Sequence, residues 1–166
     1  QIPSRQAASK AGIPWNAKTE TINKVCASGM RSITLGSQMI RLGDEEVIVA
    51  GGMESMSNAP YYLPKGRFGL RMGDGQMVDG MIYDGLSCSF HPKRVHMGTY
   101  GNSTAETFEL SREKQDEWSY RSHSLALKAI ESGIFAEEIV PVEIPQRKGD
   151  PIVVTQDEAP RTDTSV

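Results

Sequence analysis

The chain has 166 residues, of which 38% are hydrophobic, and its 18 basic and 21 acidic side chains give a net charge of −3. This composition is ordinary for one globular domain or a large part of one, and it allows a sizeable core, with about two thirds of the extended surface removed from water on folding. The negative charge disfavours electrostatic capture of nucleic acid, and no stretch without charged residues is long and apolar enough to cross a bilayer. We therefore expect a folded chain with no nucleic acid partner and no membrane span.

Cysteine usage bears on the cellular compartment. The two cysteines, Cys26 and Cys88, are too few for the disulfide framework of a small secreted domain. A reducing compartment, the cytoplasm, is therefore favoured. The chain opens at Gln1 instead of Met and closes at Val166 after a turn-like run, so we expect both ends to be cuts through a longer protein that could have lost a targeting segment.

The first third of the chain alternates between helical and strand patterns. Residues 5–11 form an Ala-rich helical pattern, residues 19–25 alternate as a strand does, and residues 30–43 have helical spacing that ends at a glycine. The β-branched run at residues 47–50 is typical of a parallel strand covered on both faces. The order helix, strand, helix, strand predicts an α/β fold with helices covering a sheet.

The remainder of the chain is less regular. Residues 53–101 are dense in Gly, Pro, Met and Asn and predict a long loop-rich segment. A strong helix is predicted from Ser111, its N-cap, to Gly133. Residues 139–144 and 152–155 then read as two strands of a hairpin or a meander.

Cys26 is the candidate nucleophile, because it follows a predicted buried strand and begins a predicted helix. Backbone N–H groups and the positive end of a helix dipole favour the thiolate form of a cysteine at such a position. An equally strong alternative is that Cys26 is a small buried hydrophobe, as free cysteines usually are.

No partner for Cys26 stands out from the residues alone. None of His91, His96 and His123 is a clear general base, and His123 is expected to be a surface or helix-packing residue. His91 and His96 have no cysteine or carboxylate at a zinc-like spacing, so a metal is not expected. The pair at residues 51–52 and the Gly-Asp-Gly at residues 73–75 are weak candidates for phosphate loops, because they lack the spacing of known fingerprints.

The motif Asn-Lys-Val-Cys-Ala-Ser-Gly-Met at residues 23–30 looks like the active-site motif of the thiolases, the acetyl-CoA C-acetyltransferases and 3-ketoacyl-CoA thiolases. The motif Ala-Gly-Gly-Met-Glu-Ser-Met-Ser at residues 50–57 is similar to their second N-terminal motif. His-Met-Gly at residues 96–98, followed by Thr-Ala-Glu at 104–106, resembles their coenzyme-A-binding loop domain. The resemblance covers nearly the whole chain and implies an internal fragment of a protein at least about twice as long.

The resemblance implies a layered αβαβα fold containing part of a parallel sheet, with a loop-rich α+β insertion. Residues 1–55 would belong to the N-terminal domain and residues 56–166 to the loop domain, truncated at its end. Residues 63–77 resemble the tetramerisation loop of the biosynthetic thiolases, which implies a homo-oligomer, a dimer or a tetramer; a flexible basic surface loop is the alternative.

The resemblance also assigns roles to single residues. Cys26 would accept an acyl group from an acyl-CoA thioester, which a second thioester or free coenzyme A would then attack. Leu86, His96 and Met97 would line the pantetheine channel, and Arg161 would lie near the nucleotide end of coenzyme A, although a solvated turn charge is the alternative for this arginine. No bound cofactor is implied, only coenzyme A thioesters as substrates.

Some family motifs are not in this sequence. The base of a Gly-His-Pro motif, the second cysteine of a Cys-x-Gly-Gly motif and the Asn-Glu-Ala-Phe motif are missing, and residues 91–93 look like a short insertion. Cys88 takes no role from the family. The motifs that are present predict a thiolase of fatty acid metabolism. Because the base and the second cysteine are missing, we expect the fragment alone to be nearly inert. The alternatives are a ketoacyl synthase-type condensing enzyme and a non-catalytic binding or assembly module of the same fold.

Overall fold

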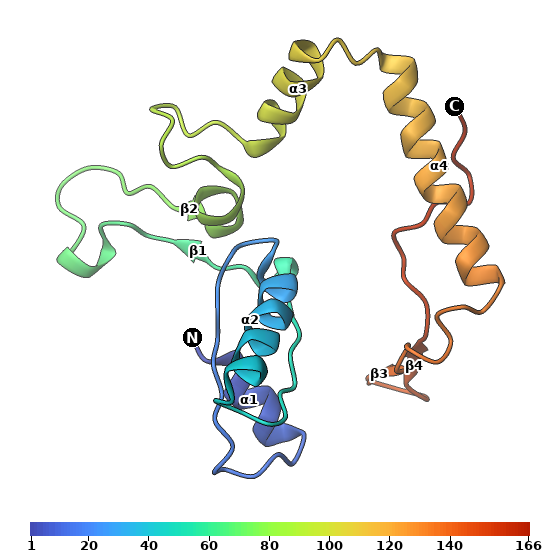
Figure 1. Ribbon diagram of the computed structural model, residues 1–166. Helices are drawn as coiled ribbons and strands as arrows, with labels where there is room; N and C mark the ends of the chain where they lie inside the picture. Colours follow the sequence, from blue (N-terminus) through green and yellow to red (C-terminus); the bar gives the residue numbers. More distant parts are fainter. The chain divides into compact units, whose positions relative to one another are not determined.

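The computed structural model describes all 166 residues, which divide into two compact units, Gln1–Met97 and Gly98–Val166. Figure 1 shows the elements in chain order from blue to red. The boundary predicted between residues 55 and 56 concerns family domains and stays a prediction.

The first unit begins with two helices, both predicted from the sequence. Helix α1 spans Pro3–Lys10, with its proline in the first turn, where the missing N–H costs nothing. Helix α2 spans Ser28–Leu42 and ends at Gly43, whose φ of 79° is the left-handed conformation that glycine adopts without strain. The Gly43 and Asp44 N–H groups bond back to the carbonyls of Ile40 and Met39, which closes the helix.

The two strands predicted at residues 19–25 and 47–50 are absent, and the structure has no parallel sheet. A strand is defined by its ladder with a neighbouring strand, and this chain offers neither segment such a neighbour. In residues 47–50, successive side chains still point to opposite sides, as they do in a strand. Ile48 is half-buried against α2, whereas Val47 and Val49 point away and are 84% and 87% exposed. The prediction that both faces of this segment are covered is therefore wrong for this chain.

The middle of the chain is loop-rich, as predicted, and carries only short elements. A 3-10 turn, η1 (Met56–Asn58), precedes strand β1 (Tyr61–Tyr62), which pairs antiparallel with β2 (Val78–Asp79). A second 3-10 turn, η2 (Gly66–Phe68), lies in the loop between them, and the π-helix η3 (Met81–Leu86) follows.

Helix α3, Met97–Thr107, begins inside the segment predicted to be irregular. Its sequence is rich in Gly, Ser and Thr and has no apolar stripe, so the usual helical pattern is missing. Three hydroxyl groups instead bond to carbonyls four residues earlier: Ser103 to Thr99, Thr104 to Tyr100, and Thr107 to Ser103. This bonding satisfies short polar side chains within a helix.

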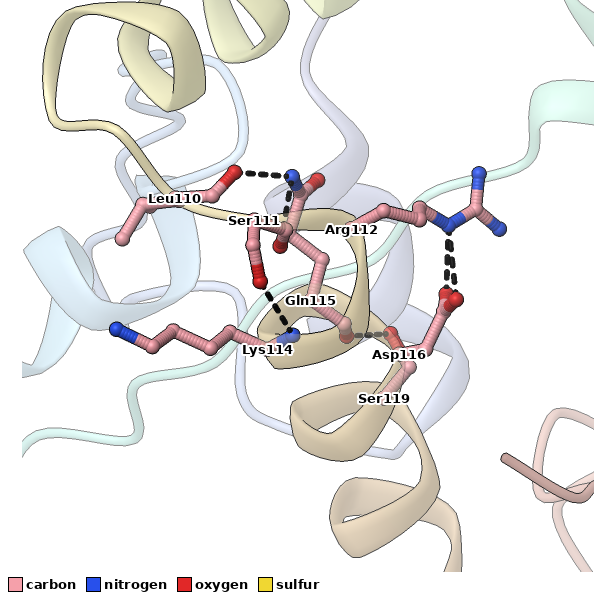
Figure 2. Close-up of polar contacts among 7 residues, drawn as sticks. All are labelled: Leu110, Ser111, Arg112, Lys114, Gln115, Asp116 and Ser119. Carbon is pink, nitrogen blue, oxygen red and sulfur yellow. Dashed lines mark hydrogen bonds and ion pairs between the residues drawn. The ribbon is translucent and has the colours of Figure 1, made fainter.

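Helix α4, Arg112–Glu131, confirms the strongest sequence prediction. Figure 2 shows its first turn, where the Ser111 hydroxyl oxygen accepts a hydrogen bond from the Lys114 N–H at 3.3 Å. Arg112 Nε lies 2.9 and 2.8 Å from the two carboxylate oxygens of Asp116, one turn along the helix. Gln115 donates to the carbonyls of Leu110 and Ser111, and Ser119 donates to the Gln115 carbonyl, so polar contacts fix the start of α4.

The predicted hairpin is also present. Strand β3 (Val142–Ile144) pairs antiparallel with β4 (Ile152–Val154), with Glu143 opposite Val153. Gly149, at φ 87°, lies in the turn between them.

No hydrophobic side chain of the chain is buried, so the sizeable core that the composition allows does not form. The accessible surface is 14852 Å², whereas a compact protein of 18.2 kDa exposes about 8,100 Å². The reason is a lack of opposing layers: apolar residues such as Val49 on one extended segment and Ile33 on α2 are exposed, with no second layer over them. None of the helices has the length and apolar character needed to span a membrane.

Candidate active site

Cys26 is exposed and lies one residue before Ala27, the N-cap of α2. The alternative of a small buried hydrophobe is therefore wrong for this chain. The first backbone N–H groups of a helix have no partners within it and carry partial positive charge, which favours anions near the tip. The placement of Cys26 beside the start of a helix is thus as predicted, although no strand ladder precedes it.

The turn that leads into Cys26 has an unusual backbone conformation. Val25 has φ 52°, a left-handed conformation that costs a β-branched residue about 1–3 kcal/mol. Asn23 Oδ1 accepts a hydrogen bond from Val25 N at 2.8 Å. The Ser28 hydroxyl donates to Val25 O at 2.7 Å and accepts from Lys24 N at 2.8 Å.

The second N-terminal motif packs against the start of the same helix. A Cβ on Gly52 would lie 3.1 Å from the Cα of Gly29, so only glycine fits this approach without displacement. Ser32 Oγ lies 2.7 Å from Gly29 O and 3.0 Å from Gly51 O, within hydrogen-bond distance of both. The glycine at position 52 is thus explained by close packing on the helix that follows Cys26, whereas a Cβ on Gly51 would meet nothing within 4 Å.

Three of the residues expected to contact coenzyme A lie together. Leu86 ends η3, the next residue, Ser87, pairs with His96 in an antiparallel bridge, and Met97 begins α3. Cys88 N also donates to Val95 O at 2.9 Å, which closes the base of this loop. The structure therefore brings Leu86, His96 and Met97 together.

The tip of the same loop holds the expected insertion at residues 91–93. Arg94 N donates to His91 O at 2.9 Å, and Lys93 N donates to His91 Nδ1 at 3.2 Å. The Arg94 guanidinium lies 3.7 Å from the centre of the Tyr83 ring and donates to the Tyr83 carbonyl. His91 is therefore part of a turn, and Arg94, which the sequence did not single out, anchors that turn to η3.

Arg161 belongs to the second unit. Its backbone N–H donates to His123 Nδ1 at 3.1 Å, which ties the C-terminal segment to α4. Its guanidinium forms an exposed ion pair with Asp163 at 3.3 Å, and the hydrogen bond from Arg161 lowers the pKa of the Asp163 carboxyl. An exposed pair of this kind is weak, so a phosphate could displace Asp163 at little cost.

No cluster of three or more His, Cys, Asp or Glu side chains has the arrangement of a metal site. The arrangement therefore offers an exposed cysteine at a helix tip as its main chemical feature.

Comparison with known proteins places this geometry in a family. The family model described as "Thiolase, N-terminal domain" matches residues 1–166. An acetyl-CoA acetyltransferase of Pseudomonas aeruginosa is 51% identical over the whole chain, and a probable acetyl-CoA acetyltransferase of Mycolicibacterium smegmatis is 48% identical over 99% of it. The chain spans 42% of the length of each of these curated relatives.

A solved structure also matches this chain and belongs to an enzyme of the same kind as these relatives. The crystal structure of the Bacillus anthracis acetyl-CoA acetyltransferase matches 99% of this chain with a TM-score of 0.91 and 41% sequence identity, and the match covers 41% of that protein's chain. The fold is therefore a thiolase-like α/β fold, as predicted. The match of every residue to the thiolase family model favours a thiolase over the alternative of a ketoacyl synthase. The chain belongs to the thiolase family, whose N-terminal domain model matches all of its residues.

Proposed function

We propose that this chain supplies the acyl-accepting cysteine of an enzyme that exchanges acyl groups between coenzyme A thioesters, as an acetyl-CoA C-acetyltransferase does. The observation that carries the proposal is the exposed position of Cys26, at the tip of α2, inside a thiolase active-site motif. The relatives named acetyl-CoA acetyltransferases support the choice of substrate class.

In this reaction the Cys26 thiolate attacks the thioester carbonyl carbon. A new sulfur–carbon bond forms as the bond to the coenzyme A sulfur breaks, and coenzyme A leaves as a thiolate that takes up a proton. A second acetyl-CoA, after loss of an α-proton, then attacks the acyl-cysteine, which releases acetoacetyl-CoA and restores the thiolate. The first-turn N–H groups of α2 are suited to stabilise the negative charge that develops on the carbonyl oxygen.

The proton carriers of this reaction would come from a longer polypeptide. Because the chain spans 42% of its relatives' length and lacks the Gly-His-Pro and Cys-x-Gly-Gly motifs, we place the base and the second cysteine outside it. General acid–base groups typically contribute about 10²–10⁴-fold in rate, so the chain alone should be nearly inert. The other segments would also complete the layered αβαβα fold and the sheet to which residues 47–50 would contribute.

Four residues are the proposed contacts of coenzyme A. Leu86, His96 and Met97 would line the pantetheine channel, since a narrow apolar passage suits that arm of the ligand. Arg161 would meet the nucleotide end by exchanging its ion pair with Asp163 for one with a phosphate.

The loop between β1 and β2 is the proposed oligomerisation element. It comprises residues 63–77, is closed at its base by the β1–β2 pairing, and holds Phe68 84% exposed. The resemblance of this loop to the tetramerisation loop of the biosynthetic thiolases supports a homo-oligomer, a dimer or a tetramer. The cysteine usage supports a cytoplasmic enzyme, and the substrate class supports a role in fatty acid metabolism.

The proposal is tested in the complete polypeptide with acetoacetyl-CoA and free coenzyme A, by following loss of the ketoacyl absorbance. Cys26→Ser should lower turnover by more than about 10³-fold, as loss of a nucleophile typically does, whereas the matched variant Cys88→Ser should retain it. Acetyl-CoA should also slow alkylation of Cys26. Unchanged turnover in Cys26→Ser, or alkylation that acetyl-CoA does not slow, would refute the proposal.

A further inference from the structure

The backbone just before Cys26 adopts a conformation that its own residue disfavours. Val25, Arg94 and Glu109 are the non-glycine residues with positive φ, and Val25 is the β-branched one among them, at 52°. Steric repulsion makes a positive φ rare and unfavourable for a residue with a β-branched side chain. Such a conformation persists only where surrounding groups hold it.

Two side chains hold this conformation, one from each direction along the chain. Asn23 Oδ1 accepts from Val25 N at 2.8 Å, which fixes the peptide group before Val25. The Ser28 hydroxyl donates to Val25 O at 2.7 Å, which fixes the peptide group after it. Two backbone hydrogen bonds cross the same turn, from Ser28 N to Val25 O at 3.1 Å and from Ala27 N to Lys24 O at 3.2 Å. The two side chains add to these bonds and hold the peptide groups on both sides of Val25, between which φ and ψ are the rotations.

The use of Ser28 departs from the ordinary role of a serine at a helix start. At α4 the N-cap Ser111 accepts from an N–H group within the first turn of its own helix. At α2 the N-cap is Ala27, which has no capping side chain, and Ser28 bonds backward to Lys24 N and Val25 O. Its hydroxyl therefore serves the turn that precedes Cys26 and leaves the forward N–H groups of the first turn uncapped.

We propose that Asn23 and Ser28 are positioning residues, which hold Val25 at positive φ and so fix the direction in which Cys26 presents its sulfur. This inference rests on the proposed function of Cys26 as acyl acceptor. If either hydrogen bond is lost, Val25 relaxes toward negative φ, and the backbone that carries Cys26 rotates relative to α2. Acyl transfer then slows because a misdirected nucleophile reaches the thioester carbonyl less often.

The test uses the complete polypeptide and four single variants: Asn23→Ala, Ser28→Ala, the conservative Ser28→Thr, and the matched control Ser37→Ala on the same helix. Two rates are measured by mass spectrometry, acetylation of Cys26 by acetyl-CoA and its alkylation by iodoacetamide. Asn23→Ala and Ser28→Ala should each slow acetylation about tenfold with little change in KM, the size expected for loss of one hydrogen bond. Ser28→Thr and Ser37→Ala should stay near the rate of the unaltered protein.

Replacing the strained residue separates positioning from general damage. Glycine adopts positive φ without strain, so in a Val25→Gly background the effect of Ser28→Ala on acetylation should shrink from tenfold to below about threefold. Equal effects of Ser28→Ala in both backgrounds would overturn the proposal, as would a rate for Ser28→Ala equal to that for Ser37→Ala. If Ser28→Ala alone does not fold, the double variant must fold and react; its failure would also overturn the proposal.

The same measurements distinguish a failure of the positioning proposal from a failure of the proposed function. No acetylation of Cys26 in the unaltered protein would refute the proposed function. The alkylation rates of Cys26 in Asn23→Ala and Ser28→Ala would still decide whether these residues control its presentation, since alkylation needs no acyl donor.

Discussion

Gly52→Ala is the substitution whose effect follows most directly from the structure. The added methyl group would lie 3.1 Å from the Cα and 3.5 Å from the N of Gly29, in the first turn of α2. Both contacts are with backbone, which cannot rotate away as a side chain can. Either the segment around Gly52 or the tip of α2 must therefore shift by a few tenths of an ångström.

The expected magnitude comes from overpacking. Forcing one extra carbon into a close contact typically costs about 1–3 kcal/mol, and we expect a loss of this size in the stability of the complete protein. The displacement is also transmitted to Cys26, which lies three residues before Gly29 in the chain. A reactive group moved by about 1 Å can lose about 10²-fold in rate, so a smaller shift should lower acyl transfer several-fold.

Gly51→Ala is the matched control, because a methyl group on Gly51 would meet nothing within 4 Å in this chain. The two variants are compared by thermal unfolding and by the rate of acetoacetyl-CoA cleavage in the complete polypeptide. Gly52→Ala should lower both the unfolding midpoint and the rate, and Gly51→Ala should leave both near their original values. Equal behaviour of the two variants would refute the inferred close packing of the second motif on α2.

Three further predictions concern α4 and the isolated chain. Ser111→Ala removes the N-cap and should destabilise α4 by about 1 kcal/mol, seen as faster hydrogen exchange of its first amides. Backbone and Ser111 hydrogen bonds lower the pKa of Glu113 from its usual 4.5, so their stabilisation is present above pH 4.5 and is lost as the pH falls through the lower folded-state pKa. Protection of the first amides of α4, measured relative to their intrinsic exchange rates at each pH, should fall over that range, but not in Glu113→Gln. The isolated chain, lacking a buried core, should bind hydrophobic dyes and self-associate in sedimentation experiments, and a monodisperse monomer with native near-UV circular dichroism would contradict this.

The elements that the sequence predicted well are those whose signals are local. Helix α4 begins at Ser111 and α2 ends at Gly43 because capping depends on residues within one turn. The β3–β4 hairpin follows from two β-branched runs around a turn. Helix α3 was missed because its hydroxyl side chains replace the apolar stripe as the visible pattern.

The strands at residues 19–25 and 47–50 could not be established from their own residues. A strand exists through its neighbours, and Val47, Ile48 and Val49 show only the alternation of one. In the candidate site, the position of Cys26 was predictable from its motif, whereas the roles of Asn23 and Ser28 depend on the φ angle of Val25. The sequence signal for the role of Ser28 was the alanine at position 27, which cannot cap α2, followed directly by a serine that is free to bond to the preceding turn.

Isotope-labelled acetyl-CoA tests the central claim most directly. The complete polypeptide is mixed with it, quenched in acid, digested, and mapped by mass spectrometry. The label should be found on the peptide that contains Cys26, as a thioester that hydroxylamine removes, and Cys26→Ser should abolish it. Label on another side chain, or label that survives in Cys26→Ser, would contradict the assignment of Cys26 as the acyl acceptor.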